Sequence, residues 1–178
     1  TGEFNLGQNI KILSNNQQTT VKGIIRDFSF VKNAIKDDSI AILCEDDIDI
    51  SKGDLITTSD NNLTKNETFT AHIIWMGNEQ LLIDNIYLLQ SYFGYVEFKI
   101  KHILHKYNLE NFSHEIVDTL MINEVGLVEI STAKKVFFEN YDNDKTLGSF
   151  IIIDKISNST IGCGMIKDVI ENDNHLSE

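Results

Sequence analysis

Residues 147–166 have the sequence LGSFIIIDKISNSTIGCGMI, which predicts a β-hairpin. The first strand, residues 150–153, is a short apolar run rich in β-branched side chains, typical of a strand buried on both faces. Polar turn formers follow it. Residues 160–166 then form the second strand, in which Gly162 and Gly164 leave room for a neighbouring backbone or a bulge.

Two strings within this hairpin also carry a family resemblance. The first has the pattern Gly-Ser-Phe-Ile-x-Ile-Asp over 148–154, and the second has Thr-x-Gly-x-Gly-Met-Ile over 160–166. At this separation they resemble the signature hairpin of the GTP-binding subunit of bacterial sulfate adenylyltransferase, a translation-factor-like GTPase. The alternative interpretation is a generic hairpin without family meaning.

The composition indicates a globular protein and disfavours binding to nucleic acid. The chain has 178 residues and is 42% hydrophobic, enough for one domain or two small ones with a true core. Its 27 acidic and 15 basic residues give a net charge of −12, which opposes phosphate backbones but leaves a basic protein partner possible. No apolar run approaches the roughly 20 residues of a membrane helix. We therefore expect a cytoplasmic protein with neither nucleic acid nor membrane as a partner.

The first part of the chain predicts short strands at close spacing, over 9–13, 21–25 and 39–43, which are typical of a β-barrel or sandwich. This part resembles the second domain of translation-factor-like GTPases, and residues 43–55 resemble the closing string of that barrel. The resemblance implies that the opening strand lies upstream of residue 1. We therefore expect a partial barrel over 1–58 in a fragment of a longer protein.

The polar residues 57–68 predict a linker, so a second domain is placed at 59–178. In the strand predicted at 69–76, Phe69, Ala71, Ile73 and Trp75 share one face. Short strands are expected at 81–83 and 86–90. This order resembles the third domain of the same GTPases, a complete β-barrel, so the predicted fold class is all-β with two barrels.

The remainder of the second domain has a mixed pattern. A long strand is predicted at 95–104, with Val96, Phe98, Ile100 and His102 on one face. Residues 113–120 predict one or two helical turns. A further strand is expected at 134–138, and the polar tail from 168 to 178 is expected to fray.

The residue types that often carry chemistry do not assemble into a motif. His102 and His105 lie three apart on a predicted strand, so they point to opposite faces and cannot easily hold one ion. His72 and His114 have no partner nearby in sequence. Cys44 and Cys163 are expected to be buried small hydrophobes rather than a disulfide or metal pair.

An acidic cluster precedes the linker: Glu45, Asp46, Asp47 and Asp49. Ile48 and Ile50 interrupt its spacing and no glycine occupies the turning position, so a solvated loop is favoured over a calcium site. The chain also has no P-loop string and no Asn-Lys-x-Asp string, and Gly162-Cys163-Gly164 lies within a predicted strand rather than before a helix. No catalytic, cofactor-binding or metal residue is therefore assigned.

The resemblance implies a function for a larger assembly. In this family a GTPase domain, absent here, binds GTP with magnesium, and a separate catalytic subunit uses ATP and sulfate to make adenosine 5′-phosphosulfate and pyrophosphate. The barrels would dock the catalytic subunit and the protein's own GTPase domain without catalysing a step. The sequence departs from the family at Asp144, Lys145 and Leu147, which leaves the contacts of that loop in doubt.

Two other functions stay open. The barrels could hold tRNA or ribosomal RNA, as in a translation-factor-like module, although the net charge and the lack of a basic aromatic stripe weigh against this. The parent protein could also carry a fused adenylyl-sulfate kinase, on which this sequence is silent.

Overall fold

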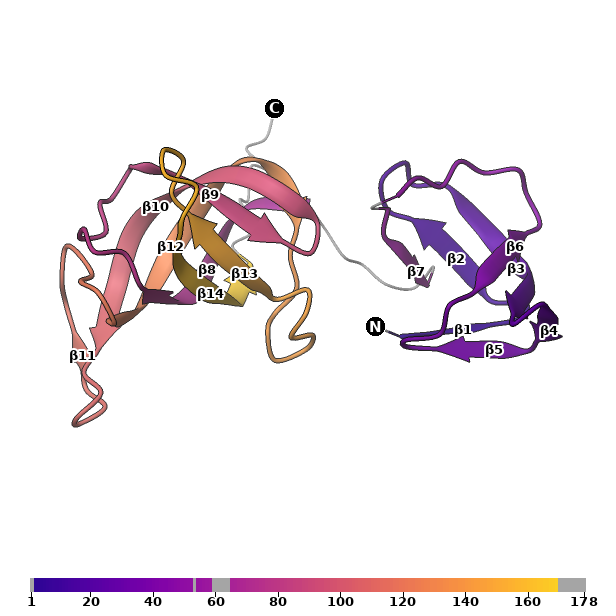
Figure 1. Ribbon diagram of the computed structural model, residues 1–178, viewed down its shortest axis with the longest axis horizontal. Helices are drawn as coiled ribbons and strands as arrows, with labels where there is room; N and C mark the ends of the chain where they lie inside the picture. Colours follow the sequence, from indigo (N-terminus) through magenta and orange to yellow (C-terminus); the bar gives the residue numbers. More distant parts are fainter. Residues whose placement is uncertain (1, 53, 59–64, 170–178) are drawn as a thin grey trace, which may run out of the picture. The chain divides into compact units, whose positions relative to one another are not determined.

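The computed structural model describes residues 2–52, 54–58 and 65–169. The chain divides into two compact units, Thr1–Asn62 and Leu63–Glu178. Every regular element among the described residues is a β-strand, which confirms the predicted all-β class (Figure 1). Accordingly, these ranges contain no helix long and apolar enough to cross a membrane.

The described part of the first unit consists of two antiparallel sheets, the larger of which is organised around one long strand. Its strands are β1 (Glu3–Asn5), β2 (Asn9–Ile12), β3 (Gln18–Arg26), β4 (Ser29–Val31), β5 (Asn33–Ile35), β6 (Ala41–Cys44) and β7 (Ile56–Thr58). β3 pairs with β2 at its start and with β4 and β6 near its end, while β7 pairs with β2. β1 and β5 pair separately, and Ile10, Val21 and Ile24 form the core.

The second unit is a closed antiparallel barrel. Its strands are β8 (Lys65–Trp75), β9 (Ile86–Ser91), β10 (Gly94–Tyr107), β11 (His114–Glu115), β12 (Val125–Phe137), β13 (Ser149–Ile153) and β14 (Thr160–Val169). Six of them form the ring β10–β12–β8–β14–β13–β9, which closes because β9 also pairs with β10. β11 extends the end of β10. The hairpin predicted from the sequence is β13–β14.

Strict alternation along β8 builds one wall of the barrel core. Phe69, Ala71, Ile73 and Trp75 are all buried, as predicted, because successive side chains of a strand point to opposite faces. The Trp75 indole Nε1 donates a hydrogen bond of 2.8 Å to the Glu79 carbonyl, which satisfies the polar atom of this buried ring.

The alternation predicted for β10 is wrong beyond Ile100. Its register against β12 shifts between Ile100 and His102 and again between Ile103 and His105. Each β-bulge adds one residue to the strand, which exchanges the two faces. His102 is therefore exposed, while Ile103 takes the buried position.

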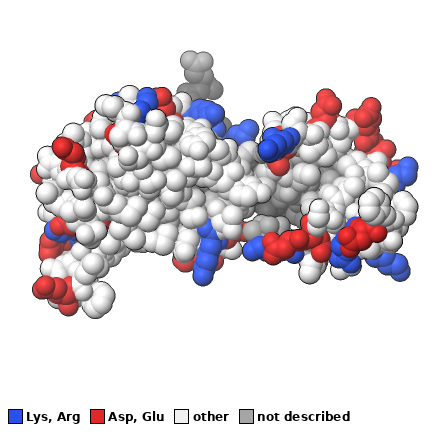
Figure 2. All heavy atoms as spheres, in the orientation of Figure 1, with Lys and Arg blue, Asp and Glu red and all other residues white. Residues whose placement is uncertain are grey.

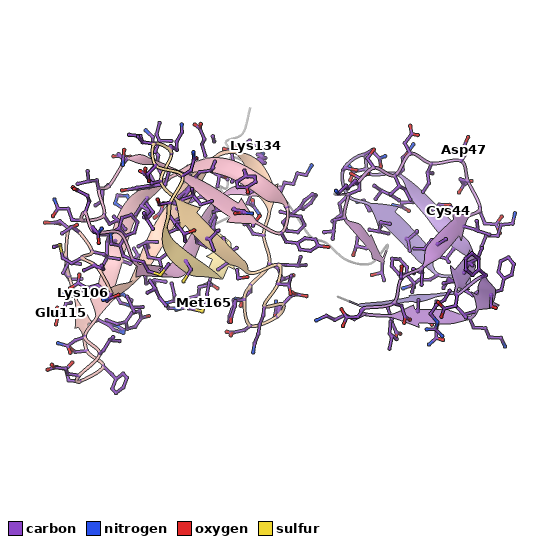
Figure 3. All side chains as sticks on the ribbon, viewed as in Figure 1. Cys44, Asp47, Lys106, Glu115, Lys134 and Met165 are labelled. Atoms are coloured by element: carbon purple, nitrogen blue, oxygen red, sulfur yellow. The ribbon has the colours of Figure 1, made fainter. Side chains whose placement is uncertain are left out.

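The helix predicted at 113–120 is also wrong. His114 and Glu115 form β11, and Lys106 on β10 is ion-paired with Glu115 at 3.2 Å (Figure 3). Further along, the Thr119 hydroxyl donates to the Leu81 carbonyl at 2.7 Å. These hydrogen bonds to distant parts of the chain replace those that a short isolated helix would make with itself.

Three smaller expectations also change. The strand expected at 81–83 is absent, because the Leu81 N–H donates to the Leu120 carbonyl of a loop instead. The separate strand expected at 134–138 belongs largely to the end of β12. The linker and tail are shorter than predicted, since β8 begins at Lys65 and β14 ends at Val169; residues 59–64 and 170–178 lie outside the described residues.

Candidate functional site

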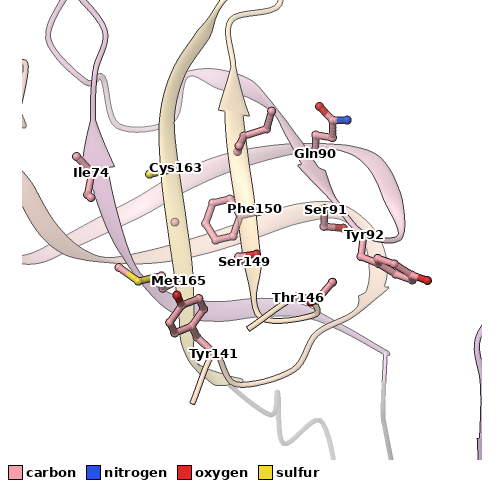
Figure 4. Close-up of a pocket in the computed structure, with 12 residues that line it drawn as sticks. Ile74, Gln90, Ser91, Tyr92, Tyr141, Thr146, Ser149, Phe150, Cys163 and Met165 are labelled. Carbon is pink, nitrogen blue, oxygen red and sulfur yellow. The ribbon is translucent and has the colours of Figure 1, made fainter. Parts of the chain in front are cut away.

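A groove of about 550 Å³ runs along the predicted hairpin, and we refer to it as the hairpin groove (Figure 4). Its lining comes from strands β8, β9, β13 and β14 and from the loops that follow β9 and β12. The lining includes Ile74, Gln90, Tyr141, Ile151, Cys163 and Met165.

Strand register places the apolar members of this lining side by side. Ile151 on β13 is paired with Cys163 on β14, and Cys163 is paired with Ile74 on β8. All three side chains are half-buried, in contrast to Phe150 and Ile152, which alternate with Ile151 and lie in the barrel core. The hairpin thus buries one face and offers an apolar row on the other.

The hairpin groove is uncharged. None of its twelve lining residues is acidic, basic or a histidine, although 24% of the chain is charged. Figure 2 shows the corresponding broad expanse without charge on the barrel, where β13 and β14 lie in Figure 1. Without a carboxylate, a histidine or a basic side chain, the groove lacks the groups that most often act as general acids or bases, and Cys163 alone is no ligand set for a cation. It suits an apolar segment of another protein.

The loop before β13 forms one rim of the groove through hydrogen bonds of its own. The Asp144 carboxylate accepts from the Thr146 N–H at 2.8 Å and from the Leu147 N–H at 3.0 Å. Leu147 is buried. Asp144 and Leu147, two of the three residues that depart from the family pattern, therefore shape this turn. The third, Lys145, is exposed.

The two cysteines are free and only half-buried, so the expectation of burial is met in part. Cys163 lies in the hairpin groove, whereas Cys44 lies at the end of β6. Desolvation, followed by the nearby negative charge of Asp46, raises the pKa of the Cys44 thiol, which keeps it protonated and unreactive near neutral pH.

The acidic cluster of the first unit makes contacts within that unit. The Asp46 carboxylate accepts from the Thr19 hydroxyl at 2.9 Å, and Glu45 is ion-paired with Lys22 at 3.5 Å. Among the described residues, no group of three or more His, Cys, Asp or Glu side chains is arranged to hold a metal ion.

The tertiary structure gathers three histidines that the sequence left apart. The rings of His105 and His114 stack with centroids 3.9 Å apart, and the edge of Tyr107 meets both. The Tyr107 hydroxyl and His72 Nδ1 are 3.2 Å apart, within hydrogen-bonding distance. No sequence signal indicated this cluster, because it depends on the pairing of β11 with β10 and on the second bulge.

This cluster predicts acid sensitivity. Desolvation, followed by the positive charges of His114, His72 and Lys167, lowers the pKa of His105 below its ordinary value. The unfolded chain therefore binds a proton at His105 more readily than the folded chain does. The contribution of neutral His105 to the free energy of unfolding is full above about pH 6.5 and is lost as the pH falls toward the lowered pKa. Urea unfolding across pH 7.5 to 5 should show this loss, and His105→Phe should reduce it. An unchanged pH profile in His105→Phe would contradict the assignment.

The sequence of the barrel is similar to that of a known family. The sequence model of the GTP-eEF1A C-terminal domain-like family matches residues 68–167, which span the closed barrel from β8 to β14. The chain belongs to this family.

Relatives along the whole chain agree with the hairpin resemblance and confirm it. The chain is 31% identical to sulfate adenylyltransferase subunit 1 of Shewanella woodyi and 30% identical to that of Bacteroides fragilis, in each case over 96% of this chain and 36% of the relative. It is 27% identical to the bifunctional enzyme NodQ of Rhizobium meliloti, over 93% of this chain and 26% of the relative. The chain thus spans about a third of the length of these subunit 1 relatives.

The fold of this chain is also similar to that of a solved structure. The crystal structure of Sup35 complexed with GDP superposes with a TM-score of 0.78 at 17% identity, over 96% of this chain and 42% of that one. At this identity the likeness concerns the fold alone. It agrees with the predicted translation-factor-like architecture.

Proposed function

We propose that this chain is the non-catalytic barrel region of the GTP-binding subunit of sulfate adenylyltransferase and that it docks the catalytic subunit. The observation that carries the proposal is the hairpin groove, which is apolar and uncharged in a strongly acidic chain. Apolar surface removed from water contributes about 25 cal/mol per Å², so such a groove favours association with another apolar surface. The similarity to proteins named subunit 1 supports the choice of partner.

The chemistry of the assembly is assigned to other parts. GTP and its magnesium ion would bind in a GTPase domain, and ATP and sulfate would react in the catalytic subunit to give adenosine 5′-phosphosulfate and pyrophosphate. The hairpin groove is lined by no Asp, Glu, His, Lys or Arg, so it lacks the side chains that most often move a proton in such reactions. The proposal places this assembly in the cytoplasm.

The barrel's contribution is mechanical coupling. The six strands of the ring β10–β12–β8–β14–β13–β9 are each paired on both sides, so the ring would move as a rigid body. A rigid body attached to a GTPase domain can convert nucleotide-dependent reorientation into displacement of whatever is docked on it. GTP hydrolysis would in this way be transmitted to the catalytic subunit.

Calorimetric titration of the chain with the catalytic subunit from the same source tests the proposal. We expect micromolar or tighter binding, and at least a tenfold loss of affinity in Met165→Glu, because the new carboxylate must be desolvated in the groove. Ile156→Ser is the matched control, since Ile156 is 94% exposed in the turn of the same hairpin and does not line the groove.

Absence of binding by a chain shown to be folded by circular dichroism would contradict the proposal and move docking to the GTPase domain. Retention of tRNA by the chain in a low-salt filter assay would instead favour the translation-factor-like alternative.

A further inference from the structure

The turn between β3 and β4 holds an aromatic residue in an unfavourable backbone conformation. Arg26 is paired with Ser29, so Asp27 and Phe28 are the two central residues of the turn. Both have positive φ angles, 50° and 60° respectively. A two-residue hairpin turn with two positive φ angles normally contains Asn-Gly, because a bulky side chain is strained in this region.

Among the described residues of the first unit, no packing of the Phe28 side chain offsets this strain. The Phe28 side chain is fully exposed, with a relative accessibility of 104%. An aromatic ring that packs against a core could offset an unfavourable backbone angle through burial, but this ring projects into solvent. Sites of unrelieved strain are frequently functional ones.

The sheet carries a largely exposed apolar surface directly beside this turn, and we call that surface together with Phe28 the Phe28 face: Ile25, Phe28, Phe30, Ala41 and Leu43. Strand pairing aligns Phe30 with Ile25 and Ile25 with Ala41. A Cβ atom on Gly23 would lie 3.2 Å from both Leu43 Cδ1 and Phe30 Cε1, so these side chains come together over the glycine. Phe30 is 75% exposed and Leu43 is 42% exposed.

The charges beside this face argue against nucleic acid and anionic lipid. The two basic residues of β3, Lys22 and Arg26, are ion-paired with Glu45 at 3.5 Å and with Asp38 at 2.7 Å. Asp27 adds an exposed negative charge next to Phe28. Single-stranded nucleic acids stack on aromatic rings that lie beside free cations, and β3 offers none. A protein surface with an apolar cleft and a basic rim is the complementary partner.

We propose that the Phe28 face is a docking surface for the catalytic subunit, with Phe28 as the anchor that inserts into an apolar cleft on that subunit. This inference rests on the proposed function for the identity of the partner. Protruding aromatic side chains commonly supply a large part of the affinity at protein interfaces. On this proposal the strained turn has a purpose. Glycine at position 28 would relax the backbone but would also remove the anchoring ring.

The substitution Phe28→Gly separates docking from folding. Glycine suits the positive φ, so the melting temperature of the variant should equal or exceed that of the parent chain. In calorimetric titration with the catalytic subunit, the same variant should bind at least tenfold more weakly. Phe30→Ser, in the middle of the face, should also weaken binding. Leu6→Ser is the control, because Leu6 is 51% exposed in the same unit but lies outside the face.

The outcomes distinguish this inference from the proposed function. If the parent chain binds and Phe28→Gly binds equally well, the inference is overturned and the proposed function stands. If the parent chain does not bind, both are overturned. Binding of polyuridylate or of phosphatidylserine vesicles that is lost in Phe28→Gly would assign the face to another class of partner and would also overturn the inference.

Discussion

Replacing Gly148 with alanine is expected to destabilise the barrel more than any other single substitution considered for it. A Cβ atom at this position would lie 2.5 Å from Tyr141 Cα and 2.6 Å from Tyr141 N, so it meets backbone rather than a flexible side chain. The backbone there is held in place, since the Tyr141 N–H donates to the Ile166 carbonyl at 2.9 Å and the Ile166 N–H donates to the Gly148 carbonyl at 2.8 Å. Relieving the clash would break these bonds.

Overpacking of an interior usually costs 1–3 kcal/mol, and because rigid backbone is involved here we expect about 3 kcal/mol or more. Urea unfolding followed by circular dichroism measures this loss in Gly148→Ala. Ser149→Ala, at the next position, adds no volume and should stay within about 0.5 kcal/mol of the parent chain. A free energy of unfolding within about 1 kcal/mol of the parent for Gly148→Ala would show that the loop can move.

Replacing Gly164 with alanine is expected to cost about 2–3 kcal/mol of stability through a different contact. The added Cβ would lie 2.2 Å from Phe150 Cζ, because Gly164 is paired with Phe150 and the ring covers it. Phe150 is buried and meets Phe69 edge-on with ring centroids 5.9 Å apart. The ring therefore has little freedom to move away.

A double-mutant cycle tests this pairing directly. Phe150→Leu alone should destabilise the barrel, because it leaves a cavity in the core. In combination with Gly164→Ala, however, the smaller side chain makes room for the new methyl group, so the double variant should lose at least about 1 kcal/mol less than the sum of the single losses. Additive losses in urea unfolding would contradict the contact between residues 150 and 164.

The local pattern of the chain was sufficient for much of the fold. Alternation of apolar residues identified β8 and its buried face, and the apolar run at 150–153 with two following glycines identified β13–β14. These features repeat with the period of two residues that a strand imposes, so they can be recognised without knowledge of any partner strand. The predicted all-β class followed from the same signal.

The errors occurred where a distant partner decides the local structure. The first bulge in β10 moves His102 to the exposed side, although an uninterrupted strand was predicted over 95–104. Residues 113–120 have the apolar spacing of a helical turn, but hydrogen bonds to Leu81 and pairing with β10 hold them extended. Such contacts join residues far apart in sequence, and local propensity is too weak to resist them.

The sequence by itself determined that this chain forms strands, which side of β8 is buried, and that its hairpin resembles that of sulfate adenylyltransferase subunit 1. Only the tertiary structure decided that Ile74, Ile151 and Cys163 form one apolar row and that Phe28 projects from a strained turn. The reason is physical. The pattern of a strand specifies which of its side chains face inward. The neighbours of each outward side chain depend on the register between paired strands, and this register is fixed only in the folded sheet.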